Sequence, residues 1–232
     1  MKVAIMYSGG KDSTYAIEYA QQQGWDIQYL LSVKPTRTDC YLFHFATVEY
    51  TPMLAKVLGY KHILLSCSVA DPQLEANIVR DAVLKQEKVD AVILGGIGLQ
   101  ETQLRTLQET LLPEGIEVFA AHAGDDHAML VENMLSKGYK IMITQFASDG
   151  LKSWLGKHIT QENFSQLKAD AVKYGFHIGF EGGYADTLVV DGPIFKQKLD
   201  ILSFDKVFES EYAGHVKVTD AVLVEKVVAR IQ

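Results

Sequence analysis

The chain of 232 residues has only two cysteines, Cys40 and Cys67, and they lie far apart. Without a Cys-x-x-Cys pair, the sequence excludes a disulfide scaffold and a thiolate metal site. It also lacks an apolar run near the roughly 20 residues that cross a bilayer. Residues 1–5 carry no signal-peptide core. We therefore expect a cytoplasmic protein that does not act in a membrane.

Positive charge is also scarce, because 22 Lys and Arg face 29 Asp and Glu for a net charge of −7. That balance predicts no broad nucleic-acid surface. The seven histidines, His122 and His127 among them, form no tight sequence cluster, so we interpret them as ordinary surface or core residues rather than metal ligands. A hydrophobic content of 48% nevertheless predicts a folded globular chain.

Over residues 1–145, short apolar runs alternate with helical patterns. This rhythm predicts an α/β fold, a doubly wound parallel sheet with helices on both faces. The expected strands are 3–7, 27–33, 61–66, 91–94, 116–121 and 140–144, and the expected helices begin near residues 11, 47, 72, 99 and 125. Ligands of such a sheet bind at the carboxyl ends of its strands.

The rhythm changes after Gln145. One helical pattern over 161–174 is followed by β-like runs near 187–190, 199–208 and 215–218. We interpret residues 146–232 as a second, smaller α+β domain that binds a substrate, and residues 1–145 as the nucleotide-binding domain.

The turn after the first strand carries the strongest functional pattern. It consists of Ser8, Gly9, Gly10, Lys11, Asp12 and Ser13. Glycines at a strand-to-helix turn let backbone amides approach a phosphate, and the helix N-terminus adds partial positive charge. The string fits neither the P-loop of nucleoside triphosphatases nor the dinucleotide fingerprint.

This string resembles the S-G-G-x-D-S loop of the PP-loop ATP pyrophosphatases, which implies a PP-loop (HUP-like) domain. By that resemblance the loop holds the β- and γ-phosphates of ATP, Lys11 neutralises charge, and Asp12 binds Mg²⁺ or caps the helix. From the expected topology, Gly95, Gly96 and Ser32 lie beside the nucleotide. Arg105 either stabilises an adenylate or simply caps a surface helix.

The chain further resembles the diphthine–ammonia ligase family. Three segments carry the resemblance: residues 41–44, which include His44; residues 153–157, which include Trp154 and Lys157; and residues 181–193, which begin Glu-Gly-Gly-Tyr-Ala-Asp-Thr. In the third segment Tyr184 and Asp186 stand where the family pattern has glutamates, and Lys157 replaces an arginine. The resemblance implies a role in binding and activating the acceptor, the substrate that carries the carboxylate, for Glu181, Gly182, Gly183, Tyr184 and Asp186.

The reaction so implied uses Mg-ATP to activate the diphthine carboxylate of translation elongation factor 2, releases pyrophosphate, and forms an amide with ammonia. Glu181, Asp186, Tyr184 and Trp154 are then candidates for holding the trimethylammonium group of diphthine. Two alternatives remain: another PP-loop chemistry on a different carboxylate or on RNA, and a non-catalytic ATP-binding sensor. The sequence leaves homo-oligomer formation open.

Overall fold

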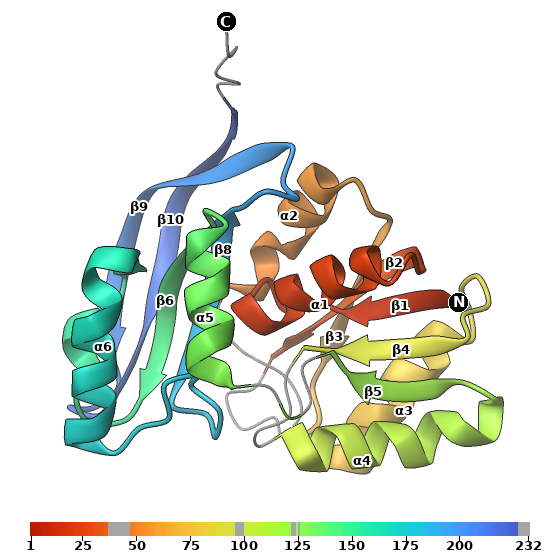
Figure 1. Cartoon of the computed structure of the whole chain (residues 1–232). Coiled ribbons are helices and arrows are strands. Elements are labelled where there is room, and N and C mark those ends of the chain that lie inside the picture. The colour runs from red at the N-terminus through yellow and green to blue at the C-terminus, as the bar shows by residue number, and fades with distance from the viewer. Residues whose placement is uncertain (37–46, 96–99, 122–123, 125, 227–232) are drawn as a thin grey trace, which may run out of the picture.

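In this computed structural model, the described residues are 1–36, 47–95, 100–121, 124 and 126–226. The first sheet has five strands in the order β3-β2-β1-β4-β5, and every neighbouring pair is parallel (Figure 1). The strands are β1 (Lys2–Met6), β2 (Asp26–Pro35), β3 (His62–Cys67), β4 (Ala91–Leu94) and β5 (Glu117–Ala120). The predicted parallel α/β sheet is confirmed.

Helices cover both faces of this sheet. Buried residues of α1 (Lys11–Gln22) and α2 (Thr51–Leu58) belong to one apolar cluster, with the short η1 (Val48–Tyr50) before α2. Those of α3 (Pro72–Val83) and α4 (Gln100–Leu111), followed by η2 (Leu112–Glu114), belong to another. The sheet is therefore doubly wound, as the alternating pattern predicts.

The capping residues near α2 and α3 act as their sequence predicts. Asp71 accepts a hydrogen bond from the Leu74 amide at 2.9 Å, and Pro72 occupies the first helical position, where no amide is needed. Gly59 ends α2 with a φ of 83°, which costs glycine little because it has no Cβ.

The second sheet is antiparallel and centres on β6 (Lys140–Ala147). That strand pairs with β7 (His158–Ile159), β8 (Ala185–Asp191) and β10 (Ala213–Glu225), and β9 (Gln197–Phe208) pairs with β10. The helices of this region are α5 (His127–Ser136), the short η3 (Lys152–Trp154) and α6 (Gln161–Tyr174). The chain after β5 therefore follows a mixed α and β plan, with strands that run antiparallel.

One sequence prediction is wrong: the strand at 140–144 does not continue the parallel sheet. It forms β6, and the change of sheet comes before Gln145 rather than after it. An apolar run such as Ile-Met-Ile fits the centre of either kind of sheet, so periodicity alone does not assign it.

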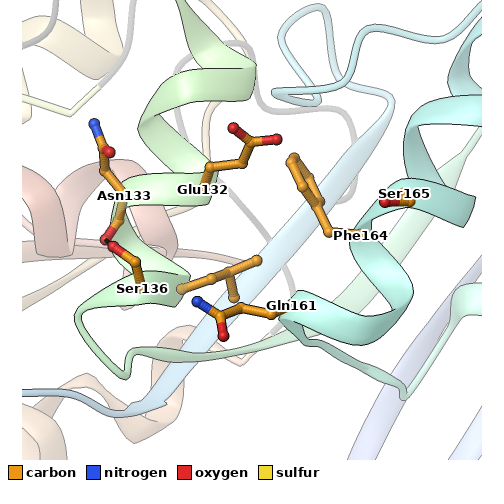
Figure 2. Close-up of a pocket in the computed structure, with 7 residues that line it drawn as sticks. Glu132, Asn133, Ser136, Gln161, Phe164 and Ser165 are labelled. Carbon is orange, nitrogen blue, oxygen red and sulfur yellow. Dashed lines mark hydrogen bonds between the residues drawn. The ribbon is translucent and has the colours of Figure 1, made fainter.

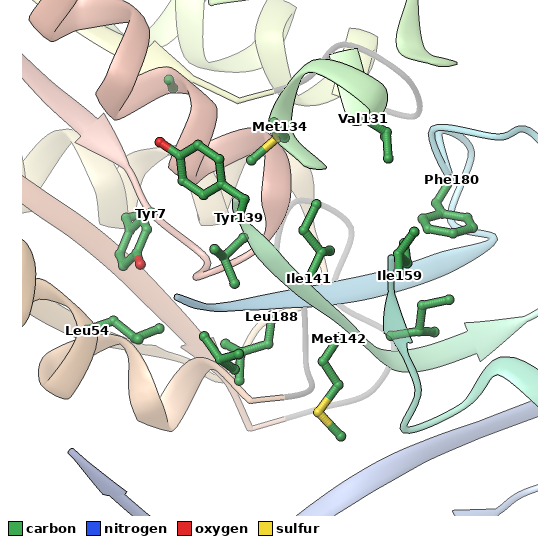
Figure 3. Close-up of a cluster of buried hydrophobic side chains, with 14 of the residues drawn as sticks. Tyr7, Leu54, Val131, Met134, Tyr139, Ile141, Met142, Ile159, Phe180 and Leu188 are labelled. Carbon is green, nitrogen blue, oxygen red and sulfur yellow. The ribbon is translucent and has the colours of Figure 1, made fainter. Parts of the chain in front are cut away.

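The two sheets nevertheless share a core. One apolar cluster contains Ile5 and Ile17 from the first sheet and its helix, together with Ile141 and Leu188 from the second sheet. Figure 3 shows Tyr7, Leu54, Tyr139 and Leu188 within it. A polar contact adds to the packing: the Tyr139 hydroxyl donates to the Glu18 carboxylate on α1 at 2.7 Å.

A small pocket of about 360 Å³ lies between α5 and α6 (Figure 2). Its lining consists of Glu132, Asn133, Leu135, Ser136, Gln161, Phe164 and Ser165. None of these residues belongs to the predicted site. Within the part of the chain that the structure describes, no helix combines the length and the hydropathy that crossing a membrane would require.

Candidate active site

The candidate site lies where the winding of the first sheet reverses. Strands β1 and β4 are neighbours, although the chain visits β2 and β3 between them. The carboxyl end of β1 leads into residues 8–13, and that of β4 leads into Gly95. Such a switch point is where open α/β sheets bind ligands, and the topology brings residues 8–13 and Gly95 to it.

Residues 8–13, called the phosphate loop below, turn back on themselves. Gly9 has a φ of 83°, which favours glycine. The Ser8 and Ser13 hydroxyls lie 3.2 Å apart, and the Ser13 hydroxyl also donates to the Gly10 carbonyl at 3.1 Å. Helix α1 begins at Lys11, so its first amides and their partial positive charge face this loop.

Gly95 closes the phosphate loop from the β4 side. A Cβ atom placed on Gly95 would lie 2.5 Å from the Ser13 nitrogen and 2.6 Å from the Asp12 carbonyl carbon. Only a residue without a side chain therefore allows β4 to end so near the first turn of α1. The result is a cradle of backbone beside the amide of Ser13, of the kind that accepts a phosphate group.

The Lys11 side chain is buried and its ammonium group has partners inside the protein. Its ammonium group donates to the Asp12 carboxylate at 2.7 Å and to the Gly179 carbonyl at 2.6 Å, and its side chain is 3% exposed. The Phe180 ring centroid lies 5.6 Å from the same nitrogen. Lys11 therefore ties the loop to a turn that lies 168 residues further along the chain.

That turn spans residues 177–180, in which the Phe180 amide donates to the His177 carbonyl at 2.8 Å. Phe180 has a φ of 62°, a left-handed conformation that bulky residues rarely adopt. Its ring is buried and lies against that of Phe176. This packing offsets the backbone strain and keeps the Gly179 carbonyl facing Lys11.

Two histidines and Glu181 stand beside this turn. The rings of His127 and His177 meet edge to face with centroids 4.8 Å apart, and His127 Nδ1 lies 3.7 Å from the Glu181 carboxylate. The Glu181 amide donates to His177 Nδ1 at 3.4 Å. Burial lowers the pKa of His177, and His127 lowers it further, so His177 is neutral near pH 7.

Strand β8 brings the segment that follows Glu181 to the phosphate loop. The Val189 amide donates to the Gly9 carbonyl at 2.8 Å, and the Lys11 amide donates to the Thr187 hydroxyl at 3.1 Å. Just before β8, Gly182 and Gly183 are exposed and have positive φ angles of 100° and 79°. The phosphate loop and the segment 181–189 are thus in direct contact.

Tyr184 and Asp186 flank the start of β8. The Tyr184 carbonyl accepts a hydrogen bond from the Ala147 amide at 2.9 Å, which fixes its backbone to β6. Its ring is partly buried, and a Cβ on Gly182 would lie 3.3 Å from it. Asp186 lies opposite Gln145 in the sheet. Both residues therefore lie near the glycine pair.

Trp154 does not offer the binding surface that its motif predicts, whereas Lys157 is exposed. The Trp154 indole is 4% exposed, and its N–H donates to Asp170 at 2.9 Å. The Lys157 ammonium lies 5.5 Å from the centroid of the Trp154 ring. The ring is packed in the core beside a cation, so the expectation that it holds a cationic substrate is corrected.

Ser32 and Arg105 are also placed differently from the sequence expectation. Strand β2 continues to Pro35, so Ser32 is not at its end; it is 1% exposed, and its hydroxyl donates to the Tyr7 carbonyl at 2.5 Å. Arg105 lies on α4 with a side chain 76% exposed, 3.8 Å from Glu109. These contacts favour a structural role for Ser32. Arg105 lies on a surface helix, but in its interior, so it pairs with Glu109 and does not cap the helix.

His62 gives a prediction about acid stability. Its Nε2 lies 2.8 Å from the Ser32 hydroxyl, and burial lowers its pKa from 6.5 to about 4. The neutral ring therefore stabilises the fold fully above pH 6.5, and this contribution is lost as pH falls towards 4. Because the ring is partly exposed, we expect the parent to lose about 1–2 kcal/mol more unfolding free energy than His62→Gln between pH 7 and pH 4.5.

Urea unfolding of both proteins at the two pH values measures this difference. Comparing parent with variant removes the contribution of carboxylates, which titrate equally in both. Equal acid sensitivity of the two proteins would show that His62 is not the group responsible.

Two predicted site residues, His44 and Gly96, lie outside the described residues, as do Cys40 and His122. Cys67 is buried in the core. The sequence interpretation missed four residues that the structure gathers at the loop: His127, His177, Gly179 and Thr187. The available signal was proximity to Glu181 in the sequence, because His177, Gly179 and Thr187 lie within ten residues of it.

Comparisons with known proteins cover nearly the whole chain. Residues 1–110 match the diphthamide synthase N-terminal domain, and residues 126–224 match the diphthamide synthase C-terminal domain. Diphthine–ammonia ligase from Danio rerio is 27% identical over 92% of this chain and 91% of its own length. The Homo sapiens protein of that name is 27% identical over 90% of this chain and 86% of its own.

Proposed function

This chain belongs to the diphthamide synthase family, and from that premise we propose that it is an ATP-dependent ligase that amidates the diphthine carboxylate of translation elongation factor 2 with ammonia. Its curated relatives are ligases of that name. The reaction would consume ATP and release AMP and pyrophosphate.

One observation carries the proposal: two segments that lie far apart in the sequence, and that we expect to serve the two substrates, are joined by hydrogen bonds. The Val189 amide donates to the Gly9 carbonyl, and the Lys11 amide to the Thr187 hydroxyl. A phosphate loop in contact with an acceptor segment would bring the phosphate bond to be cleaved close to the attacking carboxylate, which supports the proposal. Such positioning is the main source of catalysis in group transfer between bound substrates.

In the first step of the proposed reaction, a carboxylate oxygen of diphthine attacks the α-phosphorus of ATP, and the bond to the bridging oxygen breaks so that pyrophosphate leaves. In the second, ammonia attacks the acyl carbon, loses a proton, and AMP leaves. The Ser8 and Ser13 hydroxyls and the backbone at Gly95 would hold the departing pyrophosphate. The Lys11 ammonium bonds to Asp12 and Gly179. Its charge would therefore act on the phosphates through its positive potential rather than by direct contact.

Asp12 is the residue proposed to hold Mg²⁺. Among the described residues, no three His, Cys, Asp or Glu side chains are arranged as a complete metal site. Mg²⁺ commonly binds one or two carboxylates together with substrate phosphates, so a single aspartate at the phosphate loop fits its chemistry. The Asp12 side chain is 21% exposed, which leaves it accessible from the loop.

On the acceptor side, the proposed site for diphthine comprises Glu181, Tyr184 and Asp186. Their carboxylates and ring face suit a trimethylammonium group by Coulomb attraction and cation–π contact. The exposed Gly182 and Gly183 leave space for the elongation factor's side chain to approach. Ammonia and elongation factor 2 are thus the proposed partners, in the cytoplasm.

The nucleotide product tests this function. A site that cleaves ATP between its α- and β-phosphates should form AMP and pyrophosphate in equal amounts, and only when diphthine-bearing elongation factor 2 and ammonium are both present. Chromatography of the nucleotides with a coupled pyrophosphate assay measures both. ADP as the main acceptor-dependent product would contradict the proposal, whereas AMP without any need for diphthine would point to another acceptor.

A further inference from the structure

Strand β8 does more than carry the acceptor segment, because its residues 187–189 lie along the phosphate loop. The Lys11 amide, the first of helix α1, donates to the Thr187 hydroxyl at 3.1 Å in a buried environment. Two residues on, the Val189 amide donates to the Gly9 carbonyl at 2.8 Å. The loop is therefore hydrogen-bonded to the second sheet on both sides of Gly10.

The fit at Gly10 is close. A Cβ on Gly10 would lie 3.1 Å from the Thr187 carbonyl oxygen and 3.3 Å from the Thr187 hydroxyl. Thr187 itself is 9% exposed. A buried amide needs an acceptor, and leaving it without one is costly. The Thr187 hydroxyl supplies that acceptor from a strand that belongs to the other sheet.

From these contacts we propose that Thr187 is a positioning residue for the phosphate loop: its hydroxyl binds the first amide of α1 and thereby keeps the loop in the shape that receives phosphate. That the loop binds a phosphate group rests on the proposed function, whereas the hydrogen bond by which Thr187 fixes the loop does not. If the loop samples other shapes when the contact is lost, the apparent affinity for Mg-ATP falls by the fraction of molecules in the binding shape.

This arrangement also couples the two substrates. Thr187 follows Asp186 directly, so a movement of the acceptor segment on binding its substrate would reach the loop through the Thr187 hydroxyl as well as through the backbone hydrogen bond from Val189 to Gly9. A coupling of this kind is reciprocal: if the acceptor tightens Mg-ATP binding, Mg-ATP tightens acceptor binding by the same factor.

The test uses the full chain and begins without nucleotide. Thr187→Val keeps the shape and β-branching of the side chain but removes the hydroxyl that accepts the hydrogen bond from the Lys11 amide. Hydrogen exchange of a fragment covering residues 8–14 should become about tenfold faster in this variant, and Thr187→Ser, which retains a hydroxyl, should restore slow exchange. Circular dichroism establishes that each variant is folded.

Thr144→Val is the matched control. Thr144 is fully buried in the adjacent strand β6, and its hydroxyl has no hydrogen-bond partner among the described residues. The same substitution there should leave exchange of residues 8–14 at the parent rate. If Thr187→Val does not fold, Thr187→Ala repeats the comparison with the hydroxyl removed and the volume reduced.

Calorimetry with Mg-ATP then separates the two proposals. We expect Thr187→Val to bind Mg-ATP about tenfold more weakly than the parent, and Thr187→Ser and Thr144→Val to bind it as the parent does. Unchanged exchange of the loop in folded Thr187→Val would overturn the role of Thr187. A parent that binds no Mg-ATP would overturn the proposed function instead, and the exchange result would still decide on Thr187.

Discussion

Replacing Asp12 with asparagine should lower acceptor-dependent AMP formation about a hundredfold, with the fold retained. The asparagine amide oxygen can still accept the hydrogen bond from Lys11, which the carboxylate accepts at 2.7 Å. What is lost is the negative charge that would hold Mg²⁺ against the triphosphate. Alanine is the poorer choice, because it would remove one of the two partners of a buried ammonium group.

Asp81→Asn provides the control, because Asp81 also follows a basic residue directly and pairs with Arg80 at 2.8 Å on the surface of α3. Turnover should be unchanged in that variant. The measurement is kcat/KM for pyrophosphate release at several Mg²⁺ concentrations. Parent-like activity of Asp12→Asn at all of them would remove Asp12 from the metal site.

Glu181→Gln should separate binding from chemistry. Glutamine preserves the size of the side chain but removes the charge that faces His127 at 3.7 Å. Mg-ATP affinity should stay within about twofold of the parent, because Glu181 is proposed to serve the acceptor. Acceptor-dependent pyrophosphate release should fall about a hundredfold, because a cationic substrate loses its counter-charge.

Glu209→Gln is the matched control, since its carboxylate also lies beside a histidine, 2.6 Å from His215 Nδ1, but in the β9–β10 hairpin. It should behave as the parent in both assays. A large loss of Mg-ATP affinity in Glu181→Gln would instead assign Glu181 to nucleotide binding. The comparison is informative because Glu181 directly follows the turn at residues 177–180, whose Gly179 carbonyl accepts a hydrogen bond from Lys11.

The sequence predicts the first sheet well because each of its signals is local. The apolar run of β4, the glycine turn at residues 9–10 and the Asp71–Pro72 cap each depend on neighbouring residues, and all appear as predicted. The neighbouring positions of the β1 and β4 ends also follow from general rules of parallel sheets.

The site is less predictable because its contacts join distant segments. Nothing near Lys11 in the sequence indicates that its ammonium bonds to Gly179, or that its amide bonds to Thr187. Trp154 illustrates the opposite failure: a family motif assigned it to a substrate, whereas burial and its bond to Asp170 place it in the core. Motifs identify which residues matter, and long-range packing decides what each one does.

The apolar cluster common to both sheets bears on how this protein can be divided. A fragment ending after β5 would leave the outer face of α1 exposed to water, because Ile17 packs in the same cluster as Ile141 and Leu188, and Glu18 would lose Tyr139. A fragment beginning at α5 would expose the other half. The two halves of the chain are therefore expected to unfold together in a single transition, and neither is suited to expression alone.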